Sequence, residues 1–252
     1  IGPNEGEMAC GEYGPGRMAE PVEIVAAIGA ALGGGPLAGR HVLVTSGPTH
    51  EQIDPVRFIS NHSSGKMGFA LAAAAANAGA MVTLISGPVQ LATPAGVKRI
   101  DVTSAQQMHD AALAQAVQSD IFIGCAAVAD YRVANIAGEK MKKQGDGTLE
   151  LKLVQNPDII AAVAALSTKR PFTVGFAAET QNVLQYAKDK LARNKLDLIC
   201  ANDVSGTELG FNSDHNAVTL VWQSGELALP AQPKASLAKA ILQHIYSQFS
   251  AH

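Results

Sequence analysis

The sequence predicts an α/β fold in which helices cover both faces of a mostly parallel sheet. Short apolar runs alternate with amphipathic segments of helical period between residues 37 and 200. This alternation is typical of parallel strands connected by crossover helices. Two further segments alternate with period two, which predicts an antiparallel extension, and a polar, lysine-rich stretch predicts a mobile flap. Together these features describe a Rossmann-like, doubly wound sheet.

Five strands and four helices make up the predicted doubly wound part. The strands are expected where short apolar runs end in glycine or polar residues, at 41–45, 81–85, 121–125, 173–177 and 197–200. The helices are expected where apolar residues recur every three or four positions, at 64–78, 105–117, 157–166 and 180–194.

The remaining segments of this domain predict an antiparallel extension, a closing helix and a flap. Residues 148–154 and 217–222 alternate with period two, and a further short run at 226–229 follows a turn. These three segments predict the antiparallel extension. A closing helix is expected at 235–249. Residues 131–147 are polar and contain lysines and glycines, which predicts the mobile flap.

The N-terminal segment differs from the rest. Frequent glycines and prolines over residues 1–20 predict no regular structure there. Residues 22–32 have helical periodicity, and the glycine-rich break at 33–36 is typical of a linker. We therefore expect an N-terminal segment at 1–35 and a main domain at 36–252.

Composition narrows the possible functions. The 252 residues are 47% apolar and include 24 glycines, which supports a sizeable, tightly packed core. A formal net charge of −3 argues against nucleic-acid binding, and no apolar run is long enough to span a membrane. The N-terminus lacks a secretory pattern, and Cys10, Cys125 and Cys200 have neither metal-ligand nor redox spacing. We expect a cytoplasmic protein.

The loop after the first strand predicts an anion site. Ser63, Ser64 and Gly65 stand at a helix start, where free backbone N–H groups and the helix dipole favour a phosphate or a carboxylate. The serines alone could simply cap the helix. The loop is longer than a cap requires, however, and it carries four further polar residues: Asp54, Arg57, Asn61 and Lys66.

Two common nucleotide-binding motifs are absent from this loop. A P-loop would need glycine in place of Ser60 and a hydroxyl residue in place of Met67. The glycines of the loop also lack the spacing of the dinucleotide fingerprint. The anion site therefore belongs to neither class.

Small and polar residues follow three further strands. Ligands of open α/β sheets bind beyond the carboxyl ends of the strands, so these positions should share one rim. The run at 124–130 would let a ring or ribose approach the backbone, and Phe176 could line a base. Polar groups also appear in the run at 200–203, directly after the last apolar strand. Taken singly, the alanines of that run and Phe176 also fit an ordinary core. Their convergence favours a site.

Several charged residues have two interpretations. Lys140, Lys142 and Lys143 form either a solvated surface or a flap that closes over a triphosphate. Asp158 either compensates a helix dipole or lies near a nucleotide and its metal ion, and Lys190 is either a helix-end cation or a rim contact. The residues alone leave these alternatives open and identify no metal ligands.

Several motifs resemble those of a known family. They include NHSSGKMG at 61–68, within a match that starts at Asp54, and KMKK at 140–143. The others lie at 125–131, 156–158, 175–180 and 201–203. In order and spacing, across residues 37–250, they resemble bacterial phosphopantothenate–cysteine ligase, the second half of a bifunctional coenzyme A biosynthesis protein.

The resemblance implies a CTP-dependent reaction in two steps. In that family, the carboxylate of 4′-phosphopantothenate attacks the α-phosphate of CTP in the presence of Mg2+, which releases pyrophosphate and leaves an acyl-cytidylate. The amine of L-cysteine then displaces CMP and gives 4′-phosphopantothenoylcysteine. Family members are dimeric, so the resemblance also implies a homodimer.

Residue roles follow from the matched motifs. Lys140 is expected to stabilise the transferring phosphate, and Asn61 to position the acyl-cytidylate with help from Arg57. Substrate contacts are expected from Asn61, Arg57, Ala126 and Ala127. Together with the anion-loop argument, the motifs predict CTP contacts from Ser63, Ser64, Gly65, Gly124, Cys125, Ala126, Asp130, Lys140, Pro157, Asp158, Ile159, Ile160, Phe176, Lys190 and Asn194. Asn194 departs from the family pattern, which has lysine there.

The N-terminal segment carries a separate resemblance. Residues 8–21 resemble the end of the flavin-dependent phosphopantothenoylcysteine decarboxylase, where the cysteine that matches Cys10 donates a proton. The FMN-binding part of that enzyme has no counterpart in this sequence. Residues 1–35 are therefore expected to be a decarboxylase remnant without decarboxylase activity of its own.

Two other function classes compete with the ligase. A nicotinamide-dependent oxidoreductase could use a Rossmann-like sheet, although the glycine fingerprint is absent. A non-catalytic nucleotide-binding or assembly module is the third possibility. Product identification with CTP, compared with ATP, GTP and UTP, would separate the three classes.

Overall fold

The main body of the protein is an eight-stranded sheet. A computed structural model describes residues 2, 4–7, 13–19, 21, 24, 28–29, 34–142, 147–179, 182–203 and 213–251. The strands of the sheet are β3 (His41–Ser46), β6 (Met81–Ser86), β7 (Val97–Asp101), β8 (Ile121–Gly124), β11 (Phe172–Glu179), β12 (Leu198–Asp203), β13 (His215–Trp222) and β14 (Gly225–Pro233). Their spatial order is β14-β13-β12-β11-β8-β3-β6-β7.

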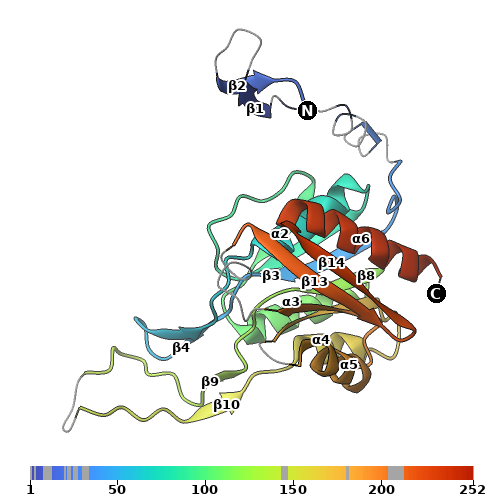
Figure 1. The fold of residues 1–252 in the computed structure, drawn as a ribbon. Helices are drawn as coiled ribbons and strands as arrows, with labels where there is room; N and C mark the ends of the chain where they lie inside the picture. Colours follow the sequence, from blue (N-terminus) through green and yellow to red (C-terminus); the bar gives the residue numbers. More distant parts are fainter. Residues whose placement is uncertain are drawn as a thin grey trace.

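The sheet and its helices form three layers. The strands from β12 to β7 run parallel to one another, and β13 and β14 add an antiparallel edge. Helices α2 (Lys66–Asn77) and α6 (Lys234–Ser250) cover one face. Helices α3 (Ala105–Ala116), α4 (Ile159–Ala164) and α5 (Val183–Arg193) cover the other face (Figure 1). The predicted doubly wound fold is confirmed.

Burial on both faces explains why the parallel strands read as continuous apolar runs. On β3, Val42 and Val44 pack toward α2, and Leu43 between them packs toward α3. All three side chains are fully buried. Successive side chains of a strand point to opposite faces, so a strand covered on both sides is apolar at every position.

Some elements differ from the prediction. β7 was missed because it is an edge strand with exposed charged residues, which hide the apolar pattern. The predicted loop after β3 contains a two-stranded ribbon of β4 (His50–Gln52) and β5 (Phe58–Ser60). Helix α4 begins later than expected because the Asp158 carboxylate accepts a hydrogen bond from the N–H of Ala161, 2.9 Å away, and so caps the helix after Pro157.

The prediction that residues 148–154 belong to the antiparallel extension is wrong. The strand there, β10 (Leu153–Gln155), pairs with β9 (Tyr131–Val133) in a separate two-stranded sheet. Period-two alternation cannot tell which strand will be the partner. The described residues 131–142 and 147–155 form an arm that projects from the main body (Figure 1). The mobility of this flap stays a prediction.

The expectation of no regular structure in residues 1–20 is also wrong. β1 (Asn4–Glu7) and β2 (Tyr13–Arg17) form an antiparallel pair despite their glycines and prolines. Residues 8–12 between them, which include Cys10, lie outside the described residues. Most of the helix predicted at 22–32 also lies outside them. The division of the chain at residue 35 stays a prediction.

Candidate active site

The carboxyl ends of the parallel strands border a cavity of about 540 Å³. The loop before α2, the loop after β8, the ends of β11 and β12, the start of β13 and residues of α5 and α6 all contribute to it. The predicted convergence of strand ends on one rim is therefore confirmed. The lining residues are Asn61, His62, Ser63, Ser64, Gly65, Lys66, Met67, Gly68, Cys125, Ala126, Ala127, Val128, Asp130, Phe176, Ala177, Lys190, Asn202, Asn216 and Lys234.

The start of α2 forms one wall of this cavity. Gly65 has a φ of 75°, a left-handed conformation that favours glycine, and no side chain caps the helix. The Ser63 hydroxyl instead accepts a hydrogen bond from the N–H of Gly65, 3.3 Å away. A Cβ at Gly68 would lie 2.5 Å from the Cβ of Ser46, so glycine lets α2 approach β3 closely. The start of α2 is thus compatible with the anion site that the sequence predicts, which stays a prediction.

A second wall follows β8. The Asn61 amide donates hydrogen bonds to the carbonyl oxygens of Val128 at 3.0 Å and Ala127 at 3.4 Å, which ties the α2 loop to this wall. Burial raises the pKa of the Cys125 thiol to about 12, and nearby Lys234 offsets only part of that shift. The Cys125 thiol is therefore a neutral lining group near pH 7.

A third wall comes from β11 and α5. The Lys190 ammonium donates to the carbonyl oxygen of Phe176 at 3.3 Å, and both residues line the cavity. Asp130 also lines it, and its carbonyl oxygen accepts a hydrogen bond from the N–H of Asn156. The base, ribose or phosphate contacts predicted for Asp130, Phe176 and Lys190 are compatible with this placement.

Several predicted contacts lie behind the lining. A Cβ at Gly124 would lie 2.6 Å from a side-chain carbon of Ile160, so these two residues pack together beneath the β8 wall. Ile159 belongs to the apolar cluster beside α3. The Asp158 carboxylate caps α4 and also accepts a hydrogen bond from the Asn194 amide at 3.3 Å. None of these residues, nor Pro157, lines the cavity.

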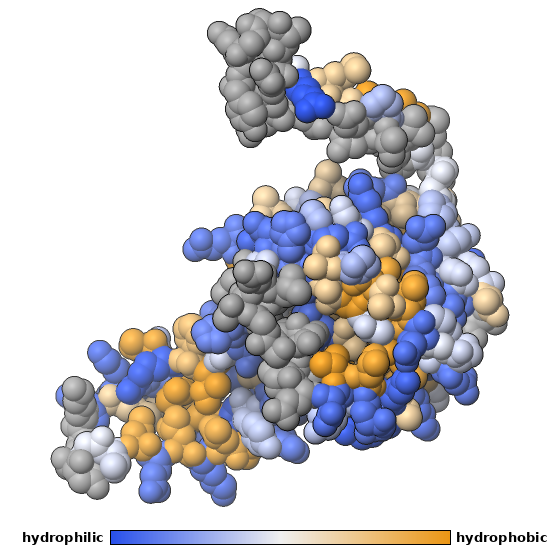
Figure 2. Space-filling view, in the orientation of Figure 1, coloured by the Kyte–Doolittle hydropathy of each residue, from blue (hydrophilic) through white to orange (hydrophobic). Residues whose placement is uncertain are grey.

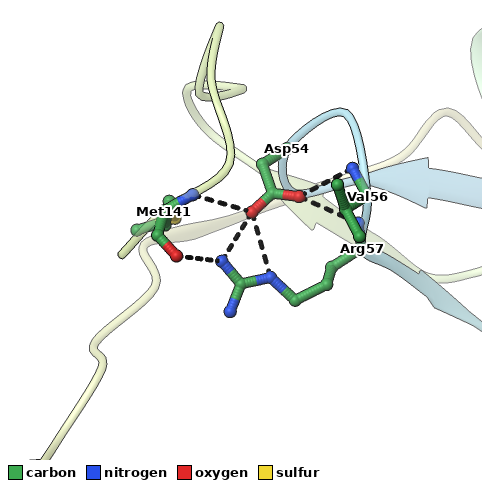
Figure 3. A network of polar contacts seen from close by, with 4 residues as sticks. All are labelled: Asp54, Val56, Arg57 and Met141. Atoms are coloured by element: carbon green, nitrogen blue, oxygen red, sulfur yellow. Dashed lines mark hydrogen bonds and ion pairs between the residues drawn. The ribbon is translucent and has the colours of Figure 1, made fainter. Parts of the chain in front are cut away.

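Arg57 and Lys140 also lie outside the cavity lining. The Arg57 guanidinium forms an ion pair with the Asp54 carboxylate and donates to the carbonyl oxygen of Met141 at 3.0 Å. The Asp54 carboxylate, whose side chain is 0% exposed, also accepts from the N–H groups of Val56 and Met141 (Figure 3). The Arg57 guanidinium is the main cause that holds the pKa of Asp54 far below its usual value.

We call this network of Asp54, Val56, Arg57 and Met141 the arm clamp. It fastens the arm to the loop after β4 at the residue next to Lys140. The prediction that Arg57 contacts substrate finds no support from this protomer, because its guanidinium is engaged in the clamp. The predicted substrate contact of Arg57 stays a prediction.

Three polar lining residues, Asn202, Asn216 and Lys234, had no role assigned from the sequence. Asn202 was noted only as a polar residue after a strand, and Asn216 and Lys234 were not considered. The last two lie at the start of an antiparallel strand and of the closing helix. The pairing of β13 with β12 brings Asn216 to the rim, and the packing of α6 against α2 brings Lys234 there, which no local pattern reveals.

A magnesium ion fits the donor set. No group of three or more His, Cys, Asp or Glu residues suited to a metal ion occurs among the described residues. Mg2+ usually takes only one or two carboxylates and completes its shell with substrate phosphates and water. Asp130, the carboxylate that lines the cavity, meets that requirement.

Comparison with known proteins identifies the family. Residues 37–249 match the model of the DNA/pantothenate metabolism flavoprotein C-terminal domain. The chain belongs to this family. No helix in the described part of the chain is long and apolar enough to cross a membrane.

Curated relatives of this chain are named as bifunctional proteins of coenzyme A biosynthesis. The chain is 57% identical over 248 residues to the coenzyme A biosynthesis bifunctional protein CoaBC of Vibrio cholerae, covering 98% of this chain and 62% of that protein. The chain thus spans less than two thirds of the length of this curated relative.

Two solved structures share the fold. The C-terminal domain of a CoaBC protein is 37% identical in sequence, and its structure superposes with a TM-score of 0.74. The superposition covers 86% of this chain and 99% of that one. A Cab2 variant in complex with phosphopantothenate-cysteine is 17% identical in sequence, and its structure superposes with a TM-score of 0.71 over 92% of this chain and 94% of that one. At this low identity, the similarity to Cab2 supports the fold alone.

Proposed function

We propose that the main domain is a CTP-dependent ligase that joins 4′-phosphopantothenate to L-cysteine in coenzyme A biosynthesis. One observation carries the proposal. In a member of this family, Asn61, Asp130, Phe176 and Lys190 line one cavity together with the uncapped start of α2. The relatives named CoaBC support the same pathway.

The chemistry requires an activated acid. A carboxylate oxygen of 4′-phosphopantothenate attacks the α-phosphorus of CTP, and the bond to the β-phosphate oxygen breaks to release pyrophosphate. The cysteine amine then attacks the carbonyl carbon, loses a proton, and CMP leaves with the bonding electron pair. Activation is needed because a free carboxylate has no good leaving group.

The first step develops negative charge on phosphate oxygens. The N–H groups at the start of α2 and the Lys190 ammonium supply fixed positive charge at the cavity. Mg2+ held by Asp130 and the phosphates would neutralise further charge. Ala126 and Ala127 leave room beside the backbone for nucleotide or substrate.

The second step requires the acyl-cytidylate to stay in place. Asn61 lies at the cavity and is itself oriented by the carbonyl oxygens of Val128 and Ala127. A rigidly oriented amide next to a reacting carbonyl fits the predicted positioning role.

We further propose that the protein is a homodimer formed through the arm. Five large apolar residues of the arm are more than a third exposed: Tyr131, Ile136, Leu149, Leu151 and Leu153. They give the arm the hydrophobic patch visible at the lower left of Figure 2. Patches of this kind commonly mark protein interfaces. Lys140 is on this arm and outside the cavity of its own protomer, so a partner's cavity is the site we assign to it.

The proposal also covers the N-terminal segment and the cellular compartment. We assign residues 1–35 to the end of a decarboxylase half, in which Cys10 would act together with FMN bound by the remainder of that half. The reaction is placed in the cytoplasm, which agrees with the free thiols of Cys125 and Cys200.

A half-reaction assay tests the ligase. With 4′-phosphopantothenate, CTP and Mg2+, the protein should release pyrophosphate and form acyl-cytidylate, and added cysteine should convert this to product. Lys140→Gln should slow the pyrophosphate step, whereas Lys98→Gln on the exposed face of β7 should not. No pyrophosphate from CTP would refute the ligase, and a fluorescence change with NADPH would favour an oxidoreductase.

A further inference from the structure

Two rows of core side chains end in asparagines at the cavity. On β12, Leu198 and Cys200 pack toward α2 and α6, and Asn202 is the next residue on that face. On β13, Leu220 and Val218 pack toward the same helices, and Asn216 is the next residue on that face. Because β12 and β13 are antiparallel neighbours, both rows end at the same rim. The apolar core is therefore replaced by amides where it meets the cavity.

The described part of the chain leaves these amides unsatisfied. The side-chain oxygens of Asn202 and Asn216 are buried and have no hydrogen-bond partner among the described residues. Asn216 is only 3% exposed. A buried polar atom without a partner is rare in a native fold and needs an explanation, such as a bound group that completes it. Both residues line the cavity, so a ligand in the cavity can supply the missing donors.

Two lysines stand over the same part of the cavity. Lys66 and Lys234 are the first residues of α2 and α6, which pack against each other on this face. Lys66 pairs with Asp214 at 2.6 Å, and the 7% exposed Lys234 donates to the carbonyl oxygen of Ser213. Burial and the neighbouring Lys66 lower the pKa of Lys234. Neither helix start carries a side-chain cap, so both dipoles add to the positive potential.

The chemistry of this wall selects its ligand. Unpartnered amide oxygens attract N–H or O–H donors, whereas lysines and helix starts attract an anion. A bare phosphate satisfies only the lysines, and a bare cation satisfies only the amides. The fitting ligand carries hydrogen-bond donors and an anionic group side by side.

We propose that Asn202, Asn216 and Lys234 form the subsite for the non-nucleotide substrate end that combines N–H donors with an anion. This inference rests on the proposed ligase function and names a part of its site. The predicted nucleotide contact Lys190 comes from α5, on the face of the sheet opposite to α6, so the start of α6 is the part of the cavity that we assign to the other substrates. Two sources share the chemistry: the ammonium and carboxylate of cysteine, and the amide and phosphate of 4′-phosphopantothenate.

Steady-state kinetics with each substrate varied in turn tests the subsite. Asn216→Leu replaces the amide with an apolar group of similar size, and Lys234→Met removes the ammonium but keeps the length. We expect each change to raise the KM of one non-nucleotide substrate at least tenfold and to change the KM of CTP less than twofold. A higher KM for cysteine would mean that the subsite binds the ammonium and carboxylate of cysteine. A higher KM for 4′-phosphopantothenate would mean that it binds the amide and phosphate of that substrate.

Stability separates binding from a structural role. Asn216→Leu should raise the thermal midpoint while it weakens binding, because the unpartnered buried oxygen is removed. A lower midpoint with an unchanged KM would instead show that the amide is structural and would overturn the proposal. Lys239→Met, at an exposed position of the same helix as Lys234, is the matched control and should change neither quantity.

The remaining outcomes are also decisive. A rise confined to the KM of CTP, or a loss of kcat alone in both variants, would overturn the subsite while wild-type turnover upholds the ligase. Absence of turnover in the wild type refutes the ligase itself. Lys234→Arg keeps the charge and should restore most of the affinity lost in Lys234→Met. A failure of this rescue, with the fold intact, would contradict the role of the positive charge.

Discussion

At the scale of single residues, the cavity is held by backbone carbonyls as much as by side chains. Asn61 donates to the carbonyls of Val128 and Ala127, and Lys190 donates to that of Phe176. These bonds orient the polar groups before any ligand arrives. Polar groups that are held in position in this way need no reorganisation during the reaction, which favours transition-state stabilisation. Single substitutions should therefore affect the chemical steps more than the fold.

Asn61→Asp tests this at the second step. A carboxylate cannot donate to the two carbonyl oxygens and would be repelled by them. We expect turnover to fall by about 100-fold, the cost of a displaced positioning group, while one equivalent of pyrophosphate is still released. Rapid-quench measurement of pyrophosphate and final product gives both quantities. Asn77→Asp, at an exposed position late in α2, is the control and should behave as wild type.

Cys125 gives a prediction for alkaline pH. Its pKa is raised from an ordinary value of 9.0 to about 12, so between these values the unfolded chain binds fewer protons than the native one. The stability contribution of this thiol is thus complete below pH 9 and is lost as pH rises toward 12, by at most about 1.4 kcal/mol per pH unit. Urea unfolding of wild type and Cys125→Ala between pH 8 and 11 measures it. Equal slopes for both proteins would contradict the prediction.

At the scale of elements, the arm clamp links two segments that are far apart in the sequence. Besides the contacts of Arg57, the N–H of Ala137 donates to the carbonyl oxygen of Ile53 at 3.0 Å. The arm is thus anchored at Ala137 and again at Met141, on the N-terminal side of its tip. Lys140 lies between the two anchors, so its position depends on them.

Asp54→Asn tests whether the clamp positions Lys140. The neutral amide weakens the bond to Arg57 and leaves the arm less ordered. We expect kcat for pyrophosphate release to fall by up to about 100-fold, as for other displaced catalytic groups. Hydrogen exchange at the Met141 amide should become faster. Asp101→Asn, which removes an exposed partner of Arg99, is the control.

Combining the change with Lys140→Gln makes this test specific. If the clamp acts through Lys140, Asp54→Asn should cost nothing further in the Lys140→Gln background. Fully additive losses would show that Asp54 acts by another route.

At the scale of the whole molecule, the exposed apolar residues of the arm lead us to expect a homodimer. The wild type should have the mass of a dimer by light scattering, because the apolar arm is otherwise left in water. Leu151→Asp should shift the mass toward the monomer and lower activity, since Lys140 would lose the partner's cavity. Leu227→Asp, at an exposed apolar position of β14, should leave the dimer intact. A monomeric, fully active wild type would refute this arrangement.

Apart from the edge strand β7, the sequence by itself determined which strands and helices of the doubly wound part follow one another along the chain, and which loops form its rim. Strand burial and helical periodicity are local patterns, so β3, α2, β8 and β11 could be predicted to within a few residues. The same reasoning placed Asn61, Ser63 and Asp130 at one cavity. The family motifs added roles for Lys140 and Arg57. No local sequence pattern predicts where these two residues lie in the fold.

Only the tertiary structure decided which distant segments meet. The arm clamp joins Asp54 to Met141, and the packing of β13 and α6 brings Asn216 and Lys234 to a cavity whose first wall begins at Asn61. Residues 148–154 show the same limit, because their alternation predicts a strand but not its partner. Hydrogen bonds and burial between such segments depend on the packed fold as a whole, so neither composition nor periodicity encodes them in a form that can be read locally.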